Sequence, residues 1–153
     1  MRPGVRLGID LGSRRIGVAR SDASGLMAFP VTTVSRGQGD LEALARLVDE
    51  HEAIEVIVGL PRHLSGADGP ASEAARAFAS ALAQDVRVPV RLVDERLTTV
   101  SAQRSLHESG RSVRTSRAVI DQAAAVVIVE SALERERQSG LPAGDLVGGG
   151  VDE

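Results

Sequence analysis

Residues 8–22, Gly-Ile-Asp-Leu-Gly-Ser-Arg-Arg-Ile-Gly-Val-Ala-Arg-Ser-Asp, place one carboxylate, that of Asp10, between an apolar run and a glycine-rich turn. Apolar residues alternate with Arg6 and Gly8 before it, which is the period-two pattern of a half-buried strand. Residues 16–19 predict a second strand after the turn, so the stretch is expected to form a β-hairpin. A carboxylate at the end of the first strand either caps the turn by accepting backbone N–H bonds or holds a cation.

The composition limits the core and the kinds of metal site. The 153 residues are enough for one domain with its own core, which must be aliphatic because the chain has two Phe and no Trp or Tyr. The absence of Cys excludes disulfides and thiolate metal sites, so any metal is expected to be a hard cation. We expect a cytoplasmic protein, since the sequence shows neither a signal-peptide pattern nor an apolar run of membrane-spanning length.

The charges are distributed unevenly along the chain. The net charge of −3 argues against a nonspecific coat on nucleic acid. Residues 1–36 nevertheless carry six Arg against two acidic residues, and residues 86–120 carry seven Arg against three. The remaining two segments, 37–85 and 121–153, are acidic. All 18 basic residues are Arg, and we interpret this as a compositional bias without functional meaning.

The rest of the chain predicts a mixed sheet with helices on its faces. A third strand is expected over residues 26–34, where Pro30 indicates a sheet edge. Two more strands, over 54–59 and 88–93, alternate with helices and are therefore expected to be parallel. The predicted helices cover residues 41–52, 70–84, 98–110 and about twenty residues after Ser116. We expect one α/β domain of residues 1–138 with a five-stranded mixed sheet, followed by a flexible tail over 139–153.

Two further carboxylates occupy positions that are costly for a charge. Asp121 shares a predicted helix face with Ala124 and Ile128, so it should point to the apolar side, where it either pairs with an Arg or binds a cation. Glu95 follows the last predicted strand and would have to reach across the carboxyl edge of the sheet toward Asp10. Three carboxylates at that edge suit one or two Mg²⁺ or Mn²⁺ ions, which prefer oxygen ligands and support phosphodiester hydrolysis.

Four ordered motifs resemble the YqgF family, the RuvX-type proteins described as Holliday junction resolvases and as pre-16S rRNA nucleases. They are residues 8–19, Val58-Gly-Leu-Pro, Val93-Asp-Glu-Arg-Leu-Thr-Thr and Ile120-Asp-Gln-Ala-Ala-Ala. The resemblance covers roughly residues 5–135 and implies a ribonuclease H-like fold with strand order 3-2-1-4-5. It also implies that Asp10, Glu95 and Asp121 are the metal-binding catalytic acids. In the wider ribonuclease H-like group the second acid commonly lies on strand four, where this chain has Gly59.

The function implied by the resemblance is a Mg²⁺- or Mn²⁺-dependent nuclease that processes the 5′ end of pre-16S rRNA in ribosome biogenesis. Its partners would be structured RNA and ribosomal precursor particles, and the protein would be a monomer or a homodimer. The expected phosphate contacts are Arg14, Arg15, Arg20, Arg62, Arg96, Arg111, Arg114 and Arg117. Arg96 could instead neutralise Glu95, and His63 could assist proton transfer or simply be solvated. With almost no aromatic residues, recognition is expected through backbone and shape.

Three other functions fit parts of the pattern. A Holliday junction resolvase would apply the same chemistry to branched DNA and would need two paired active sites. The Asp-Leu-Gly-Ser segment after a strand also resembles the phosphate loop of actin-like ATPases and sugar kinases, although this chain is too short for their second lobe. A noncatalytic nucleic-acid-binding or transcription-regulatory protein could retain the same fold.

Overall fold

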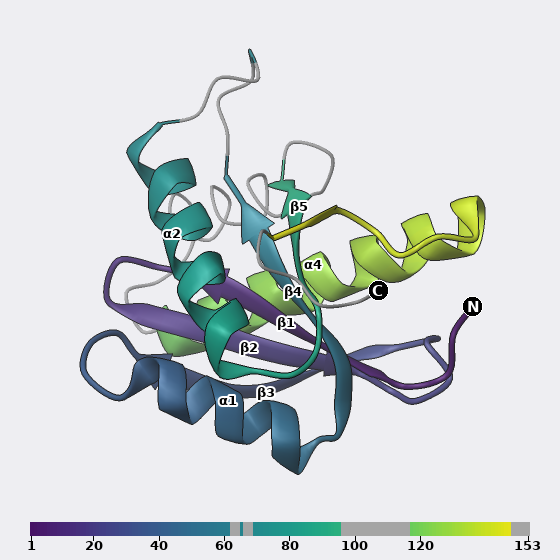
Figure 1. Ribbon diagram of the computed structural model, residues 1–153, viewed down its shortest axis with the longest axis horizontal. Coiled ribbons are helices and arrows are strands. Elements are labelled where there is room, and N and C mark those ends of the chain that lie inside the picture. Colours follow the sequence, from purple (N-terminus) through teal and green to yellow (C-terminus); the bar gives the residue numbers. More distant parts are fainter. Residues whose placement is uncertain (62–64, 66–68, 96–116, 148–153) are drawn as a thin grey trace.

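The computed structural model describes residues 1–61, 65, 69–95 and 117–147 of the chain. Its elements are, in chain order, β1 (Val5–Leu11), β2 (Arg15–Ser21), β3 (Ala28–Ser35), α1 (Asp40–Glu50), β4 (Ala53–Leu60), α2 (Pro70–Asp85), β5 (Val90–Asp94), α4 (Arg117–Ser139) and β6 (Asp145–Leu146). The strands form one mixed sheet in the order β3-β2-β1-β4-β5-β6 (Figure 1). The predicted α/β fold and the order of the first five strands are confirmed. The helix expected over residues 98–110 lies outside the described residues.

Strand pairing follows the hairpin and crossover pattern expected from the sequence. β1 is antiparallel to β2 and parallel to β4, and β4 is parallel to β5. β3 forms one edge of the sheet, where Pro30 faces Ala19 across a register shift. Proline has no N–H to donate to a neighbouring strand. It therefore destabilises a sheet least in an edge strand with an irregular register.

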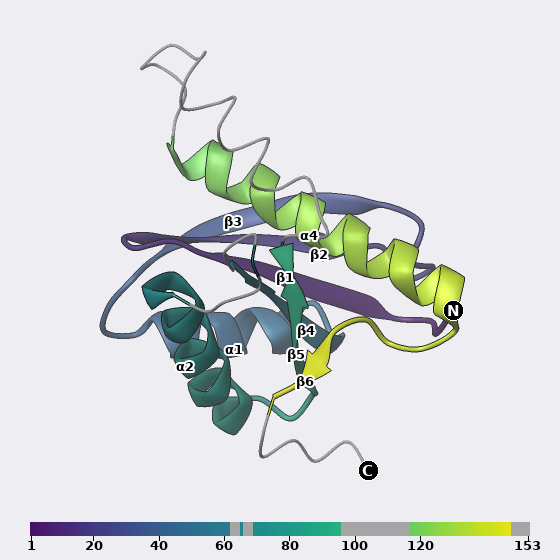
Figure 2. The same ribbon diagram turned by 90° about the horizontal axis from the view of Figure 1, so that it is seen from above.

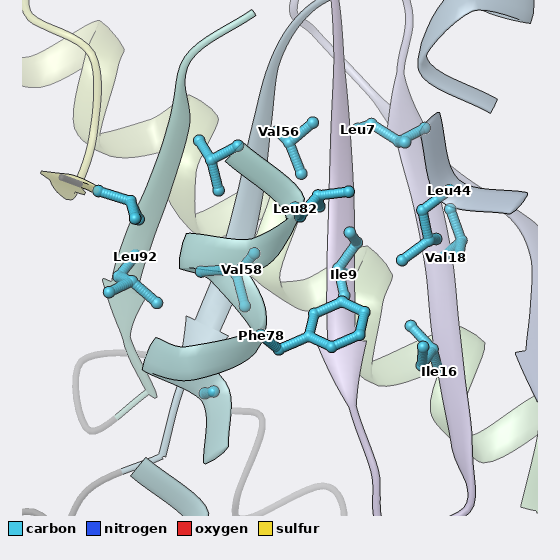
Figure 3. Packing of buried hydrophobic residues seen from close by; sticks show 14 of the residues in the cluster. Leu7, Ile9, Ile16, Val18, Leu44, Val56, Val58, Phe78, Leu82 and Leu92 are labelled. Carbon is cyan, nitrogen blue, oxygen red and sulfur yellow. The ribbon is translucent and has the colours of Figure 1, made fainter. Parts of the chain in front are cut away.

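The larger part of the aliphatic core lies on one face of the sheet. Helices α1 and α2 cover this face and α4 covers the other (Figure 2). Leu7 and Ile9 of β1 are fully buried beneath α1 and α2, and Figure 3 shows Leu44, Phe78 and Leu82 pointing toward the strands from these helices. Burial of each such side chain contributes about 1.5–3 kcal/mol, so this layer stabilises the sheet that carries Asp10.

The other face lies close to α4 because the strand residues beneath the helix, Gly8, Gly17 and Ala19, are small. Ala19 of β2 packs with Ala125, Val129 and Leu133 of α4. A Cβ added to Gly8 would overlap the side chain of Val129. The helix therefore rests almost directly on the backbone of β1 and β2. Of the helices in the described ranges, α4 included, none combines the length and apolarity needed to cross a membrane.

A buried ionic cluster joins the carboxyl half of α4 to the sheet. Arg6 of β1 is fully buried and lies 3.1 Å from Glu136 of α4. Arg2 bridges Glu136 at 2.8 Å and Glu55 of β4 at 3.1 Å, and Arg91 of β5 lies 3.4 Å from Glu55. Hydrogen bonds from Arg2 lower the pKa of Glu136 to about 2. Paired charges thus replace apolar contacts at this end of the α4 interface.

The carboxyl-terminal segment differs from the expected flexible tail and five-stranded sheet. Residues 145 and 146 form a sixth strand, β6, which pairs antiparallel with Arg91 and Leu92 of β5. Ala143 and Val147 on either side of it are buried. Two residues are too few to show a period-two pattern, so sequence alone could not indicate this strand. Residues 148–153 lie outside the described part of the chain.

Candidate active site

Asp10 lies near the carboxyl end of the central strand, on the face that α4 covers. It pairs with Gly17 of β2 in the antiparallel ladder, and directly opposed residues share a face of the sheet. A Cβ on Gly17 would run into the backbone of Asp121 in α4, so this face is the α4 face. Only 2% of Asp10 is exposed. A carboxylate so deeply buried needs compensating partners or a cation.

Glu95 reaches toward Asp10 from the far side of β4. It directly follows β5 and is 3% exposed. Val58 of β4 pairs with Ile9 of β1, so the next residues of the two strands, Gly59 and Asp10, lie side by side. A Cβ added to Gly59 would stand only 2.7 Å from Glu95 Oε2. The Glu95 carboxylate therefore occupies the space that a side chain at residue 59 would fill.

Asp121 lies in the first turns of α4, on the opposite side of Asp10 from Glu95. A Cβ added to Gly17 would stand 2.9 Å from the Asp121 Cβ and would overlap its carbonyl oxygen. Arg15, the first residue of β2, lies next to this carboxylate, and its Nε donates to Asp121 Oδ2 at 3.4 Å. Of the two alternatives for Asp121, pairing with an Arg is therefore observed.

The three carboxylates lie on the same face over three adjacent strands. Glu95 lies over β4 and Asp121 lies over β2. Each of these strands is about 4.8 Å from β1, the strand that carries Asp10. Across the described ranges, no three Asp, Glu or His side chains are close enough together to count as a ready-made metal site. The donor set is nevertheless of the kind that a hard divalent cation prefers, because all three side chains are carboxylates, and neither Gly17 nor Gly59 places a Cβ in the space beside them.

A basic turn borders the acids and is held in place by Arg36. The turn between β1 and β2 closes with a backbone bond from Gly12 to Arg15. Arg36 donates from Nη1 to the Gly12 carbonyl at 2.7 Å and from its backbone N–H to the Arg14 carbonyl at 2.8 Å. Its guanidinium also lies 5.6 Å from the ring centroid of Phe78. The turn thus presents the exposed side chain of Arg14 from a braced backbone.

The other predicted phosphate contacts divide into three groups. Arg20 pairs with Leu7 and lies over Phe29 on the face opposite Asp10, so the structure does not bring it to the acids. Arg117 is the first residue of α4. Those outside the described residues are Arg62, Arg96, Arg111 and Arg114, together with His63.

Sequence reasoning missed the roles of Gly17, Gly59 and Arg36. The two glycines flank Asp10 on neighbouring strands and make room for Asp121 and Glu95. Glycine within an otherwise apolar strand signals a close approach of another group, and this signal was available in the sequence. Arg36 offered no such signal, because its bond to Gly12 joins residues 24 positions apart.

Curated proteins of similar sequence match nearly the whole chain. A protein of Thermobifida fusca is 57% identical, and the match covers 97% of this chain and 99% of that protein. A protein of a Nocardioides species is 55% identical, with 96% and 98% covered. A Streptomyces coelicolor protein is 53% identical, with 96% and 90% covered. All three carry the name "Putative pre-16S rRNA nuclease".

Solved structures and a family model agree with the fold. Thermus thermophilus RuvC in complex with a Holliday junction substrate superimposes with a TM-score of 0.55 at 13% identity, covering 94% of this chain and 99% of that one. This likeness concerns the fold alone. The family model RuvX, described as Holliday junction resolvase, matches residues 4–135. With this match and relatives more than 50% identical over almost their full length, the chain belongs to the RuvX family.

Proposed function

We propose that this chain is a Mg²⁺- or Mn²⁺-dependent nuclease that hydrolyses phosphodiester bonds in structured RNA, with pre-16S rRNA in cytoplasmic ribosome precursors as its substrate. The proposal is supported by the placement of Asp10, Glu95 and Asp121 on the same face of the sheet, over three adjacent strands. Two of these carboxylates are almost completely buried, which is an unfavourable location unless a bound cation or another partner offsets the desolvation.

Asp10, Glu95 and Asp121 would hold the cation through carboxylate oxygens. When bound there, Mg²⁺ or Mn²⁺ activates a water for attack on phosphorus and stabilises the departing oxygen. Asp10 acts from the most rigid position, because β1 is paired on both sides and packed against helices on both faces. Gly59 and Gly17 keep the space beside it open for the other two acids.

Arg14 is proposed to contact substrate phosphates. Its side chain is exposed at the turn that follows Asp10, and Arg36 braces the backbone of that turn. A phosphate held there would lie beside the acids, so Arg14 would orient the backbone of the nucleic acid relative to the scissile bond. Arg20 is not included, because it lies on the opposite face of the sheet.

Structured RNA is favoured over single strands by the composition and by the relatives. The chain has two Phe and no Trp or Tyr, and Phe78 is buried while Phe29 lies beneath Arg20. Bases of a single strand would find few aromatic rings on which to stack. The names of the similar proteins support pre-16S rRNA as the substrate, whereas the family description supports a four-way DNA junction as the alternative.

A side-by-side cleavage assay tests the proposal. Purified wild-type protein and Asp10→Asn are incubated with a pre-16S rRNA leader or a four-way DNA junction, with Mg²⁺ or Mn²⁺. We expect the wild type to cut the RNA leader and Asp10→Asn to be slower by about 1000-fold, since loss of a cation ligand removes several kcal/mol of transition-state stabilisation. The matched control is Asp49→Asn, an exposed acid on α1, which should cut like the wild type.

The outcomes separate the candidate functions. Asp10-dependent cutting of the junction instead of the RNA would identify a resolvase, which should then be dimeric because it needs two paired sites. Cutting that is equal in wild type and Asp10→Asn would show that the carboxylates are not the catalytic groups. No cutting of either substrate by the wild type would overturn the nuclease proposal and favour a noncatalytic nucleic-acid-binding role.

A further inference from the structure

Arg15 is bonded to one carboxylate oxygen of Asp121, a residue that we propose holds the cation. Its Nε lies 3.4 Å from Asp121 Oδ2, and the two residues are 106 positions apart in the chain. The Arg15 side chain is 32% exposed and that of Asp121 is 18% exposed. The ion pair is therefore partly accessible to solvent, and hence to a cation or a phosphate.

A guanidinium and a divalent cation are unfavourable neighbours on one carboxylate. Both carry positive charge, and a cation bound at Asp121 would lie within a few ångströms of the guanidinium, where repulsion is still appreciable at the effective dielectric of a protein surface. Partial exposure of the pair screens this repulsion and limits its effect to a modest factor in affinity. A guanidinium that stays on Asp121 would therefore weaken cation binding there.

We propose that Arg15 is a built-in competitor of the divalent cation for Asp121, and that a phosphate of the nucleic acid relieves this competition by drawing Arg15 away. The inference rests on the proposed function and concerns how cation and substrate depend on each other. Because coupling between two ligands is reciprocal, the cation would also release Arg15 to bind phosphate. Cation and nucleic acid would then bind cooperatively.

Arg14 provides a matched comparison within the same turn. It is the adjacent residue and carries the same charge, but its side chain is exposed, and in the part of the chain described here it forms no ion pair with an acid. Arg15, by contrast, begins β2 and is directed onto the α4 face. Loss of either arginine changes the net charge equally, so Arg14→Gln controls for the change in net charge.

Calorimetric titration of the full-length protein with Mn²⁺ alone tests the competition without any cleavage. We expect Arg15→Gln to bind Mn²⁺ about three- to tenfold more tightly than the wild type, because the competing charge is removed. Arg14→Gln and Arg15→Lys should stay within about twofold of the wild type, since the first leaves the pair intact and the second keeps the charge. Circular dichroism verifies that each variant is folded.

Unchanged or weaker Mn²⁺ binding by Arg15→Gln would overturn the inference, as would equal tightening in Arg14→Gln or Arg15→Lys. Asp10→Asn in the same titration tests the site itself. If Asp10→Asn binds Mn²⁺ less tightly while Arg15→Gln binds it as the wild type does, the proposed cation site is supported and only the proposed competition by Arg15 is rejected. If Asp10→Asn binds as the wild type does, the proposed cation site is wrong and the inference falls with it.

A second measurement addresses the coupling to substrate. For the wild type, the Mn²⁺ concentration that gives half-maximal cleavage at saturating RNA should lie below the dissociation constant measured without RNA. In Arg15→Gln the gap between these two values should shrink by the same three- to tenfold factor by which the variant binds Mn²⁺ more tightly. A gap of equal size in both proteins would show that phosphate does not act through Arg15.

Discussion

Gly59 of β4 lies beside Asp10 and has no side chain. Side chains from two other elements fill the space that a side chain at residue 59 would occupy. Glu95 Oε2 approaches from the end of β5, and Ile128 Cδ1 approaches from α4. Glu95, which follows the next strand of the sheet, thus takes up the space beside residue 59. The identity of residue 59 therefore controls where the Glu95 carboxylate can lie.

Replacing Gly59 by Ala should affect cleavage more than stability. The new Cβ would stand 2.5 Å from Ile128 Cδ1 and 2.7 Å from Glu95 Oε2, and both are ends of flexible side chains that can move. We expect a loss of about 1 kcal/mol in unfolding free energy and a fall of at least about tenfold in cleavage rate. Urea unfolding and the cleavage assay measure the two effects.

The double variant Gly59→Ala with Ile128→Val separates the two contacts. Valine lacks the Cδ1 atom, so the overlap with α4 is relieved while the overlap with Glu95 remains. Stability should recover and cleavage should not. Recovery of cleavage together with stability would show that packing against Ile128, and not displacement of Glu95, had caused the loss.

At the scale of elements, the approach of α4 to the hairpin decides where Asp121 lies. Gly8 faces the Val129 side chain, whereas Gly17 faces the Asp121 backbone. A side chain can rotate or be shortened, but the backbone of a helix can move only with the whole helix. The two glycines, although they lie on the same face of adjacent strands, should therefore respond differently to substitution.

Gly17→Ala should destabilise the protein by at least about 3 kcal/mol, because α4 must shift to accommodate the new methyl group. Gly8→Ala should also be destabilising, but the added substitution Val129→Ala should restore much of the loss by vacating the space. Thermal unfolding of the three variants checks both statements. If Val129→Ala fails to improve Gly8→Ala, the close contact between β1 and α4 is not the cause.

The elements themselves were largely predictable because their signals are local. Period-two alternation indicated β1, the apolar residues after the glycine-rich turn indicated β2, and Pro30 indicated that β3 lies at an edge. The first helix was expected over residues 41–52 and is observed over Asp40–Glu50, as α1. β6 was not predictable, because its two residues are held by pairing with β5 and not by a pattern of their own.

For the molecule as a whole, charged groups are concentrated at both ends of the interface between α4 and the sheet. The acids of the candidate site lie toward the start of α4, and the ionic cluster around Glu136 lies near its end. Arg6 is fully buried, so its guanidinium depends on Glu136 for compensation of its charge. The cluster should therefore contribute to global stability in a pH-dependent way.

Glu136→Gln should remove part of the acid sensitivity of folding. In the folded protein the pKa of Glu136 is lowered from 4.5 to about 2, chiefly by the hydrogen bonds from Arg2. Its contribution is therefore complete above pH 4.5 and is lost as the pH falls toward 2. We expect Glu136→Gln to lose about 3 kcal/mol at pH 7 and to show a flatter decline in acid. Denaturant unfolding between pH 3 and 7 measures both.

Glu134→Gln is the control for this experiment. Glu134 also pairs with an arginine, Arg137, at 2.9 Å, but its side chain is 54% exposed. Its loss should cost less than about 1 kcal/mol at pH 7. Equal losses in the two variants would mean that burial of the cluster around Arg6 does not set its energetic importance.

The sequence by itself determined the features that depend on near neighbours in the chain. These are the hairpin around Asp10, the edge position of β3 and the aliphatic character of the core. They also include the position of Asp121 on the apolar face of its helix. Alternation along a strand and periodicity along a helix follow from backbone geometry, so they can be recognised in a few consecutive residues.

Only the tertiary structure decided which distant groups meet. Arg15 is bonded to Asp121 across 106 positions and Arg6 to Glu136 across 130, while Arg20 faces away from the acids. These outcomes depend on the register of neighbouring strands and on how closely α4 approaches them. The stretch from residue 8 to residue 22 therefore carries one acid of the candidate site, and the packing of β4, β5 and α4 supplies the other two.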